Sequence, residues 1–154
     1  MSRGVMVGLK ALVLLLSAGV VFLLAWGMPW ASGQMAETFP EFADLRMPLL
    51  LAAEVVLACA VVLLACLWQL LSQVRAGRVF DPSSLRWVNG MIGASAVAGV
   101  ALLATEFWIP GPPLLGLGML VAALVCLGLA LVLVVMRGLL VQATSFRVEL
   151  DQVI

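Results

Sequence analysis

Charged residues divide this chain into four long apolar segments. Each segment lies in an interval that carries no charge: Lys10 to Glu37, Glu54 to Arg75, Arg86 to Glu106, and Glu106 to Arg137. A helix needs about 20 residues, at a rise of 1.5 Å each, to cross the ~30 Å hydrocarbon core of a bilayer. The pattern therefore predicts an all-α integral membrane protein with spans at roughly residues 5–28, 48–71, 85–107 and 114–136.

The tryptophans support these boundaries, because every one of them lies at the end of a predicted span: Trp26, Trp30, Trp68, Trp87 and Trp108. The amphipathic indole ring prefers the interface between hydrocarbon and water. We expect a single transmembrane domain over residues 1–154, folded as a four-helix bundle. Residues 137–154 are expected to form a cytoplasmic tail.

The basic residues predict the orientation of the chain. Seven of the eight lie on one side of the predicted topology: Arg3, Lys10, Arg75, Arg78, Arg86, Arg137 and Arg147. Arg46 lies on the other side. Because basic loops stay in the cytoplasm, both termini are expected there. The first apolar run, residues 11–28, exceeds the apolar region of a secretory signal peptide, so we expect it to remain as a span.

The amino-acid composition argues against several classes of function. The chain is 65% hydrophobic and 10% charged, with a net charge of +0 and no His. The balanced charge favours no nucleic-acid partner, and the commonest metal ligand is missing. Cys59, Cys66 and Cys126 lie within spans, form no CxxC motif and are interpreted as small apolar residues. We therefore expect no catalytic, cofactor-binding or metal site, and no enzyme.

The loop between the second and third spans contains a helix stop and a helix start. Gly77 suits the left-handed position after a helix, and Asp81 followed by Pro82 is typical of an N-cap, so the third helix is expected to begin near Pro82. Three arginines around these signals are candidate contacts for anionic lipid or for a partner: Arg75, Arg78 and Arg86. Binding of a phosphate ligand is the alternative.

The tail has the pattern of an amphipathic helix that continues the fourth span. Phe146, Leu150 and Val153 recur at helical spacing, and charged residues occupy the other side. Phe146 and Leu150 are candidate partner or lipid contacts. The helix is expected to lie on the bilayer surface, to dock on a partner, or to pack against the inner loop.

Polar residues within the spans form a candidate intramembrane site of Glu54, Thr105 and Glu106. Glu54 lies six residues beyond Pro48, which places it ~9 Å into the second span. An ionisable residue at that depth is a functional candidate by default. The structural alternative is a neutral Glu54 that bonds to a backbone carbonyl or to Thr105.

Small residues recur at intervals of four on two spans. Gly90, Ala94 and Ala98 form such a stripe on the third span, and Gly4 and Gly8 do so on the first. Stripes of this kind allow helices in lipid to approach closely. The sequence leaves open whether the partner helix belongs to this chain or to a second copy.

The inner loop and the tail also carry a family resemblance. The loop contains Gly77-Arg78-Val79-Phe80, followed by Asp81-Pro82-Ser83-Ser84-Leu85-Arg86, and the tail runs from Gln142 to Ile154 with Arg147, Glu149 and Asp151. These segments resemble the small four-helix bacterial membrane proteins of domain-of-unknown-function family 2975 (DUF2975). The resemblance implies a bacterial inner membrane protein and supplies no catalytic residues.

The sequence is compatible with two functions. The first is a non-enzymatic accessory or regulatory protein that acts through its cytoplasmic loop and tail. The alternative is a small proton-coupled transporter that uses Glu54. The expected partners are the lipid bilayer and either a membrane or cytoplasmic protein or a second copy of the chain.

Overall fold

The computed structural model describes residues 2–78, 81–108 and 113–153, and these residues are almost entirely helical. Helix α1 (Arg3–Phe22) continues through a π-helical turn (Leu23–Gly27) into α2 (Met28–Thr38). A short 3₁₀ helix (Pro40–Leu45) leads into α3 (Arg46–Arg75). Helices α4 (Pro82–Glu106) and α5 (Pro113–Val153) follow. The described residues contain four helical stretches long and apolar enough to cross a membrane, so the chain is a multi-pass membrane protein.

The first helical stretch is longer than the predicted span, because Pro29 does not end it. The π-helical turn precedes this proline, and the Met28 N–H bonds to the carbonyl of Leu23, five residues back. Proline has no N–H, and its ring crowds the carbonyl of the preceding turn. A wider turn at that point gives the ring space and lets the helix continue to Thr38.

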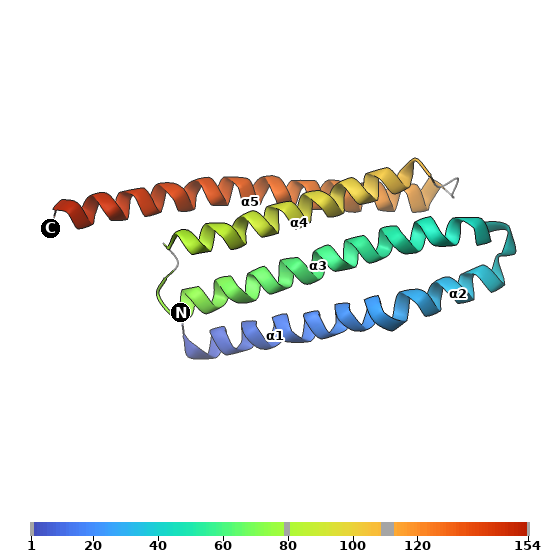
Figure 1. The fold of residues 1–154 in the computed structure, drawn as a ribbon, viewed down its shortest axis with the longest axis horizontal. Helices are drawn as coiled ribbons and strands as arrows, with labels where there is room; N and C mark the ends of the chain where they lie inside the picture. The colour runs from blue at the N-terminus through green and yellow to red at the C-terminus, as the bar shows by residue number, and fades with distance from the viewer. Residues whose placement is uncertain (1, 79–80, 109–112, 154) are drawn as a thin grey trace.

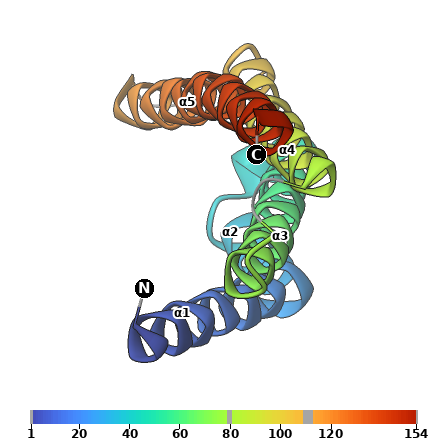
Figure 2. The same ribbon diagram turned by 90° about the vertical axis from the view of Figure 1, so that its left-hand side faces the viewer.

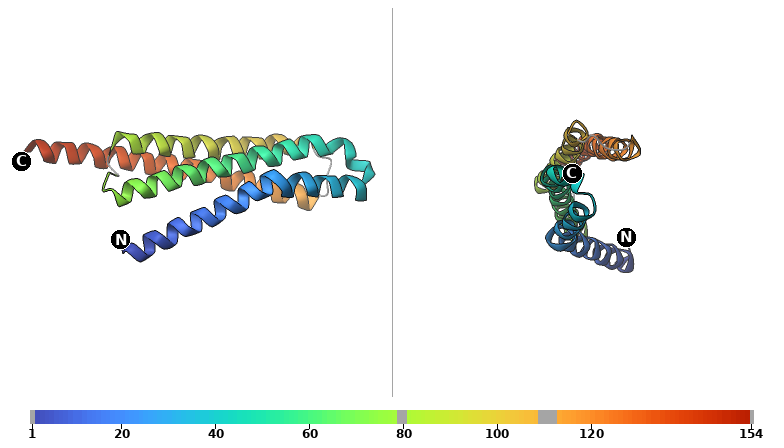
Figure 3. Two further views of the ribbon diagram at one scale, coloured as in Figure 1. Left: turned by 60° about the horizontal axis from the view of Figure 1, so that its bottom comes forward. Right: turned by 90° about the vertical axis from the view of Figure 1, so that its right-hand side faces the viewer.

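The helices are arranged as a row in which each packs on the next. Among the described residues, α3 contacts α1, α4 contacts α3 and α5 contacts α4, whereas α1 and α5 do not touch. Viewed along the helices, the row curves into an open C (Figure 2; Figure 3, right panel). The structure therefore differs from the four-helix bundle that the sequence predicts. Lipid tails are as apolar as leucine, so nothing in a bilayer drives α1 and α5 together to hide apolar side chains.

The interface between α1 and α3 is built from larger side chains. Met6 and Val13 of α1 form a buried cluster with Leu71 of α3. At the same level Lys10 Nζ donates a hydrogen bond of 3.1 Å to Ser72 Oγ and lies 4.9 Å from the centroid of the Trp68 ring. A cation over an indole face is attracted by the ring quadrupole. Lys10 thus joins the two helices near the end of α3.

Small residues bring α4 close to both of its neighbours. Ala94 and Ala98 are buried against Cys59 of α3, and a Cβ atom at Gly90 would lie 3.1 Å from Cys66 Sγ. On the α5 side, a Cβ atom at Gly99 would lie 2.8 Å from Leu127 Cγ and 3.4 Å from the Ala123 carbonyl oxygen. The stripe of small residues on the third span therefore packs within this chain.

The stripe on the first span has no such role. A Cβ atom added at Gly4 or Gly8 would meet no heavy atom within 4 Å. These glycines face open space in the monomer, and the α1–α3 contact depends on the larger side chains instead. The same sequence pattern thus has different outcomes on two helices.

Both termini lie at the same end of the row (Figure 1). At that end α5 projects beyond the start of α4 and beyond α1 (Figure 1; Figure 3, left panel). The loop that joins α3 to α4 is also at this end. We call it the loop end of the molecule.

Candidate functional site

Helix α3 ends at the loop end in the way that the sequence around Gly77 predicts. Gly77 has a φ of 72°, in the left-handed region that favours glycine. The Arg78 N–H bonds to the Gln73 carbonyl at 2.9 Å, and the Gly77 N–H bonds to the Val74 carbonyl at 3.2 Å. This pair of bonds is a Schellman motif, which satisfies the last carbonyls of α3. The motif turns the chain sharply and directs Arg78 back toward the helix it follows.

The start of α4 agrees with the prediction in position but not in detail. Asp81 is the N-cap residue with an extended backbone, and Pro82 begins the helix. The Ser84 N–H and Ser84 Oγ both bond to the Asp81 carbonyl oxygen, at 3.0 and 2.6 Å. The Asp81 carboxylate makes no capping hydrogen bond. It remains available for another group.

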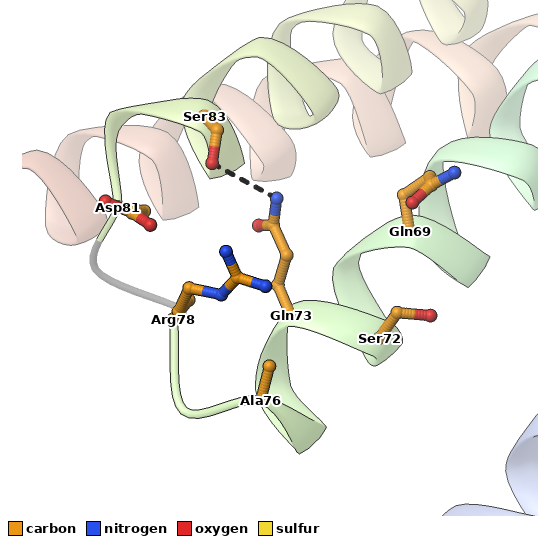
Figure 4. Close-up of a pocket in the computed structure, with 7 residues that line it drawn as sticks. All are labelled: Gln69, Ser72, Gln73, Ala76, Arg78, Asp81 and Ser83. Atoms are coloured by element: carbon orange, nitrogen blue, oxygen red, sulfur yellow. Dashed lines mark hydrogen bonds between the residues drawn. The ribbon is translucent and has the colours of Figure 1, made fainter.

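A polar cavity of about 220 Å³ lies between the end of α3 and the start of α4. Its lining residues are Gln69, Ser72, Gln73, Ala76, Arg78, Asp81 and Ser83 (Figure 4). Gln73 Nε2 donates a hydrogen bond of 3.3 Å to Ser83 Oγ, which links the two helices across the cavity. Gln73 Oε1 is buried and has no hydrogen-bond partner among the described residues.

Arg78 is the one lining residue of this cavity that the sequence pattern identifies as a candidate contact. Gln69, Ser72 and Gln73 recur at spacings of three and four residues, on one face of the last turns of α3. Polar side chains at helical spacing at the end of an apolar span are the signal that could have revealed the cavity. The sequence pattern identifies Asp81 only as a helix-start residue, and Ser83 only as part of the segment that carries the family resemblance.

The three candidate arginines all lie at the loop end and are exposed. Arg75 is the last residue of α3, Arg78 is in the loop, and Arg86 is in the second turn of α4. Of these, Arg78 alone lines the polar cavity. Its side chain points from the loop toward Gln73 and Ser83 (Figure 4).

The tail is an uninterrupted continuation of α5, which is 41 residues long. Every residue from 145 to 153 is exposed, and Phe146 and Leu150 are each 63% exposed. Among the described residues α5 contacts no element except α4. Residues 145–153 are therefore not buried against any of the described residues.

The three residues of the candidate intramembrane site do not bond to one another. Thr105 is buried, and its hydroxyl donates to the Ala101 carbonyl of its own helix at 2.7 Å. Glu106 lies against α5, where its Oε1 atom would be 2.5 Å from a Cβ atom at Gly116. Glu54 is half-buried on α3, and within the described ranges it has no hydrogen bond or ion pair. Glu54 and Glu106 thus lie in different environments.

The comparisons with known proteins agree with the resemblance seen in the sequence. Residues 30–154 match the family described as "Protein of unknown function (DUF2975)". The match contains α3, α4 and α5 in full, and the chain belongs to this family. Neither the comparison with curated proteins nor that with solved structures gives a match.

Proposed function

We propose that this DUF2975 protein is a non-enzymatic accessory protein of the bacterial inner membrane that recruits a protein partner through its C-terminal tail. Both termini are in the cytoplasm in this proposal. The loop arginines hold the loop end against the anionic inner leaflet, and the tail reaches beyond it. The tail is the single feature on which the proposal rests.

The length of α5 supports a role outside the bilayer. Its 41 residues correspond to about 60 Å of helix, roughly twice the hydrocarbon thickness. About half of the helix must therefore extend beyond the hydrocarbon core. This extra length projects at the loop end, beyond the start of α4 (Figure 1).

The surface chemistry of the tail suits a groove on a partner. Phe146, Leu150 and Val153 are exposed apolar residues at helical spacing. Arg147, Glu149 and Asp151 accompany them. An amphipathic helix of this kind binds by laying its apolar side chains into a hydrophobic groove, with charged residues at the rim.

Affinity purification through an N-terminal tag in a gentle detergent tests the recruitment. The double substitution Phe146→Ser and Leu150→Ser should abolish recovery of a stoichiometric partner. The matched double substitution Ser145→Ala and Gln152→Ala changes the same tail without removing apolar surface, and it should preserve recovery. Equal recovery with both variants, or purification of a homo-oligomer alone, would refute a docking role for the tail.

Accessibility of single cysteines tests the orientation. Cysteines introduced at Ser2, Ser83 and Gln152 should react with an impermeant reagent only from the cytoplasmic side, and one at Thr38 only from outside. The unmodified chain is the blank, since its own cysteines lie within the spans. Reaction of Thr38→Cys from the cytoplasmic side would overturn the orientation and the placement of the tail.

A further inference from the structure

We propose that the polar cavity at the loop end binds a zwitterionic phosphoester–amine group, the chemistry of a phosphoethanolamine headgroup. Arg78 and Ser83 would hold the phosphate, and Asp81 and Gln73 would hold the ammonium. The proposal does not depend on recruitment of a partner by the tail.

The cavity carries unused donors for a phosphate. Within the described ranges, the Arg78 guanidinium has no hydrogen bond or ion pair, although its side chain points toward Gln73 and Ser83 (Figure 4). Ser83 Oγ accepts its bond from Gln73, so its own proton is free to be donated. Ser83 lies in the first turn of α4, where the helix dipole favours negative charge. A planar guanidinium with fixed N–H donors matches phosphate oxygens well.

The cavity also carries unused acceptors, which a bare phosphate could not satisfy. In the part of the chain that the structure describes, Gln73 Oε1 is buried without a donor, and the Asp81 carboxylate makes no capping bond. Asp81 and Arg78 both line the cavity and form no ion pair with each other. A buried acceptor needs a donor, and a carboxylate repels an anion. An ammonium group joined to the phosphate meets both demands, since it brings N–H donors and positive charge.

The depth of the cavity fits a lipid headgroup. Trp68 on α3 comes directly before the lining residue Gln69, and Trp87 lies five residues into α4 from Pro82. Tryptophans in membrane proteins mark the headgroup level. Ser72, another lining residue, accepts the hydrogen bond from Lys10, which adds a second cation beside the cavity.

Native mass spectrometry of the full chain in detergent tests the proposal. Phosphatidylethanolamine, phosphatidylglycerol and phosphatidylcholine with identical acyl chains are the probes. The ethanolamine lipid should bind at least about tenfold more tightly than the other two, because phosphatidylglycerol has no ammonium and the choline nitrogen has no N–H donor. Equal binding of all three lipids would overturn the proposal.

Substitutions assign the two halves of the ligand. Arg78→Gln should weaken binding of the ethanolamine and glycerol lipids alike by about tenfold, through loss of the phosphate contact. Asp81→Asn should preserve the fold, because the carboxylate makes no capping bond, and it should weaken only the ethanolamine lipid. Ser83→Ala is a milder second test of the phosphate side. Arg75→Gln is the matched control, since Arg75 lies outside the cavity.

The results distinguish the source of the ligand as well. If soluble phosphoethanolamine displaces the lipid with similar affinity, the natural ligand is a free solute of this chemistry. If only the lipid binds, the ligand is a membrane component. A loss of binding in Arg75→Gln as large as that in Arg78→Gln, or an unchanged lipid preference in Asp81→Asn, would refute the site.

Discussion

Helices α4 and α5 pack side by side but differ in how much of each is buried. In the most apolar 18-residue stretch of each, 33% of α4 is buried and only 11% of α5. α4 is the least apolar of the four membrane-spanning helices, and α5 is the most apolar. In a water-soluble protein, the more apolar helix would be expected at the centre of the fold. In this protein the less apolar helix lies there, between α3 and α5.

The difference teaches what drives helix packing in lipid. A leucine gains little by leaving lipid for a helix interface, because both surroundings are apolar. Close backbone approach increases dispersion contacts and needs small residues such as Gly99 and Ala94. α4 has small residues on the sides facing both neighbours, so it takes the inner position. α5 presents mainly exposed leucine and valine, so it occupies the edge of the row.

Filling the closest approach between α4 and α5 should produce the largest effect. Gly99→Leu places a side chain where Leu127 and the Ala123 carbonyl already lie, and it should reduce the free energy of unfolding in detergent by roughly 1–3 kcal/mol. Gly93→Leu is the matched control on the same helix, since a Cβ atom there meets nothing within 4 Å. If Gly93→Leu destabilises equally, close approach is not what holds α4 between its neighbours.

The opposite edge of the row offers a smaller test. Lys10→Met removes the hydrogen bond to Ser72 and the cation over Trp68, while retaining most of the apolar stem. We expect a loss of about 1 kcal/mol in the free energy of unfolding, measured by denaturant titration in detergent. Arg3→Met, at an exposed position on the same helix, is the control. An unchanged stability for Lys10→Met would show that the α1–α3 contact depends on its apolar cluster alone.

Substitutions of Glu54 test whether this polar residue within the row of helices has a structural or a chemical role. Because the described residues give it no hydrogen bond, Glu54→Gln and Glu54→Leu should each change the free energy of unfolding by less than ~0.6 kcal/mol. Melting in detergent and proton-coupled flux in proteoliposomes are measured on the same preparations. Wild-type flux that disappears in a normally melting Glu54→Gln variant would replace the accessory proposal with transport.

Removal of the tail should have the smallest effect on stability. Deletion of residues 145–154 takes away a segment whose described residues are all exposed, so the melting temperature in detergent should be unchanged within error. A marked decrease would mean that this end of α5 supports the fold, and would weaken its assignment to partner binding. Deletion from residue 129 onward, which removes the buried Ala130, is the destabilising reference.

The sequence alone was sufficient for the four long helices and for the turn between α3 and α4, but not for the π-helical turn before Pro29. Runs without charge predicted the four long apolar helices, and Gly77 with Asp81 and Pro82 predicted where α3 ends and α4 begins. These features depend on short-range physics: the cost of charge in hydrocarbon, the left-handed backbone of glycine, and proline at a helix start. The motifs around the same loop also led to the correct family.

Only the tertiary structure decided how the helices are arranged and which polar groups meet. Similar stripes of small residues on α1 and α4 have different outcomes, since Gly4 and Gly8 face open space and Gly90 faces Cys66. Sequence spacing cannot decide which stripe packs closely, because that depends on whether a neighbouring helix covers the face that carries it. The polar cavity likewise needs Gln73 and Ser83 from two helices, brought together by the turn that Gly77 makes. Contacts between helices join residues that are far apart in the sequence. In lipid these contacts depend on close shape complementarity, whereas an apolar sequence pattern reports only hydrophobicity.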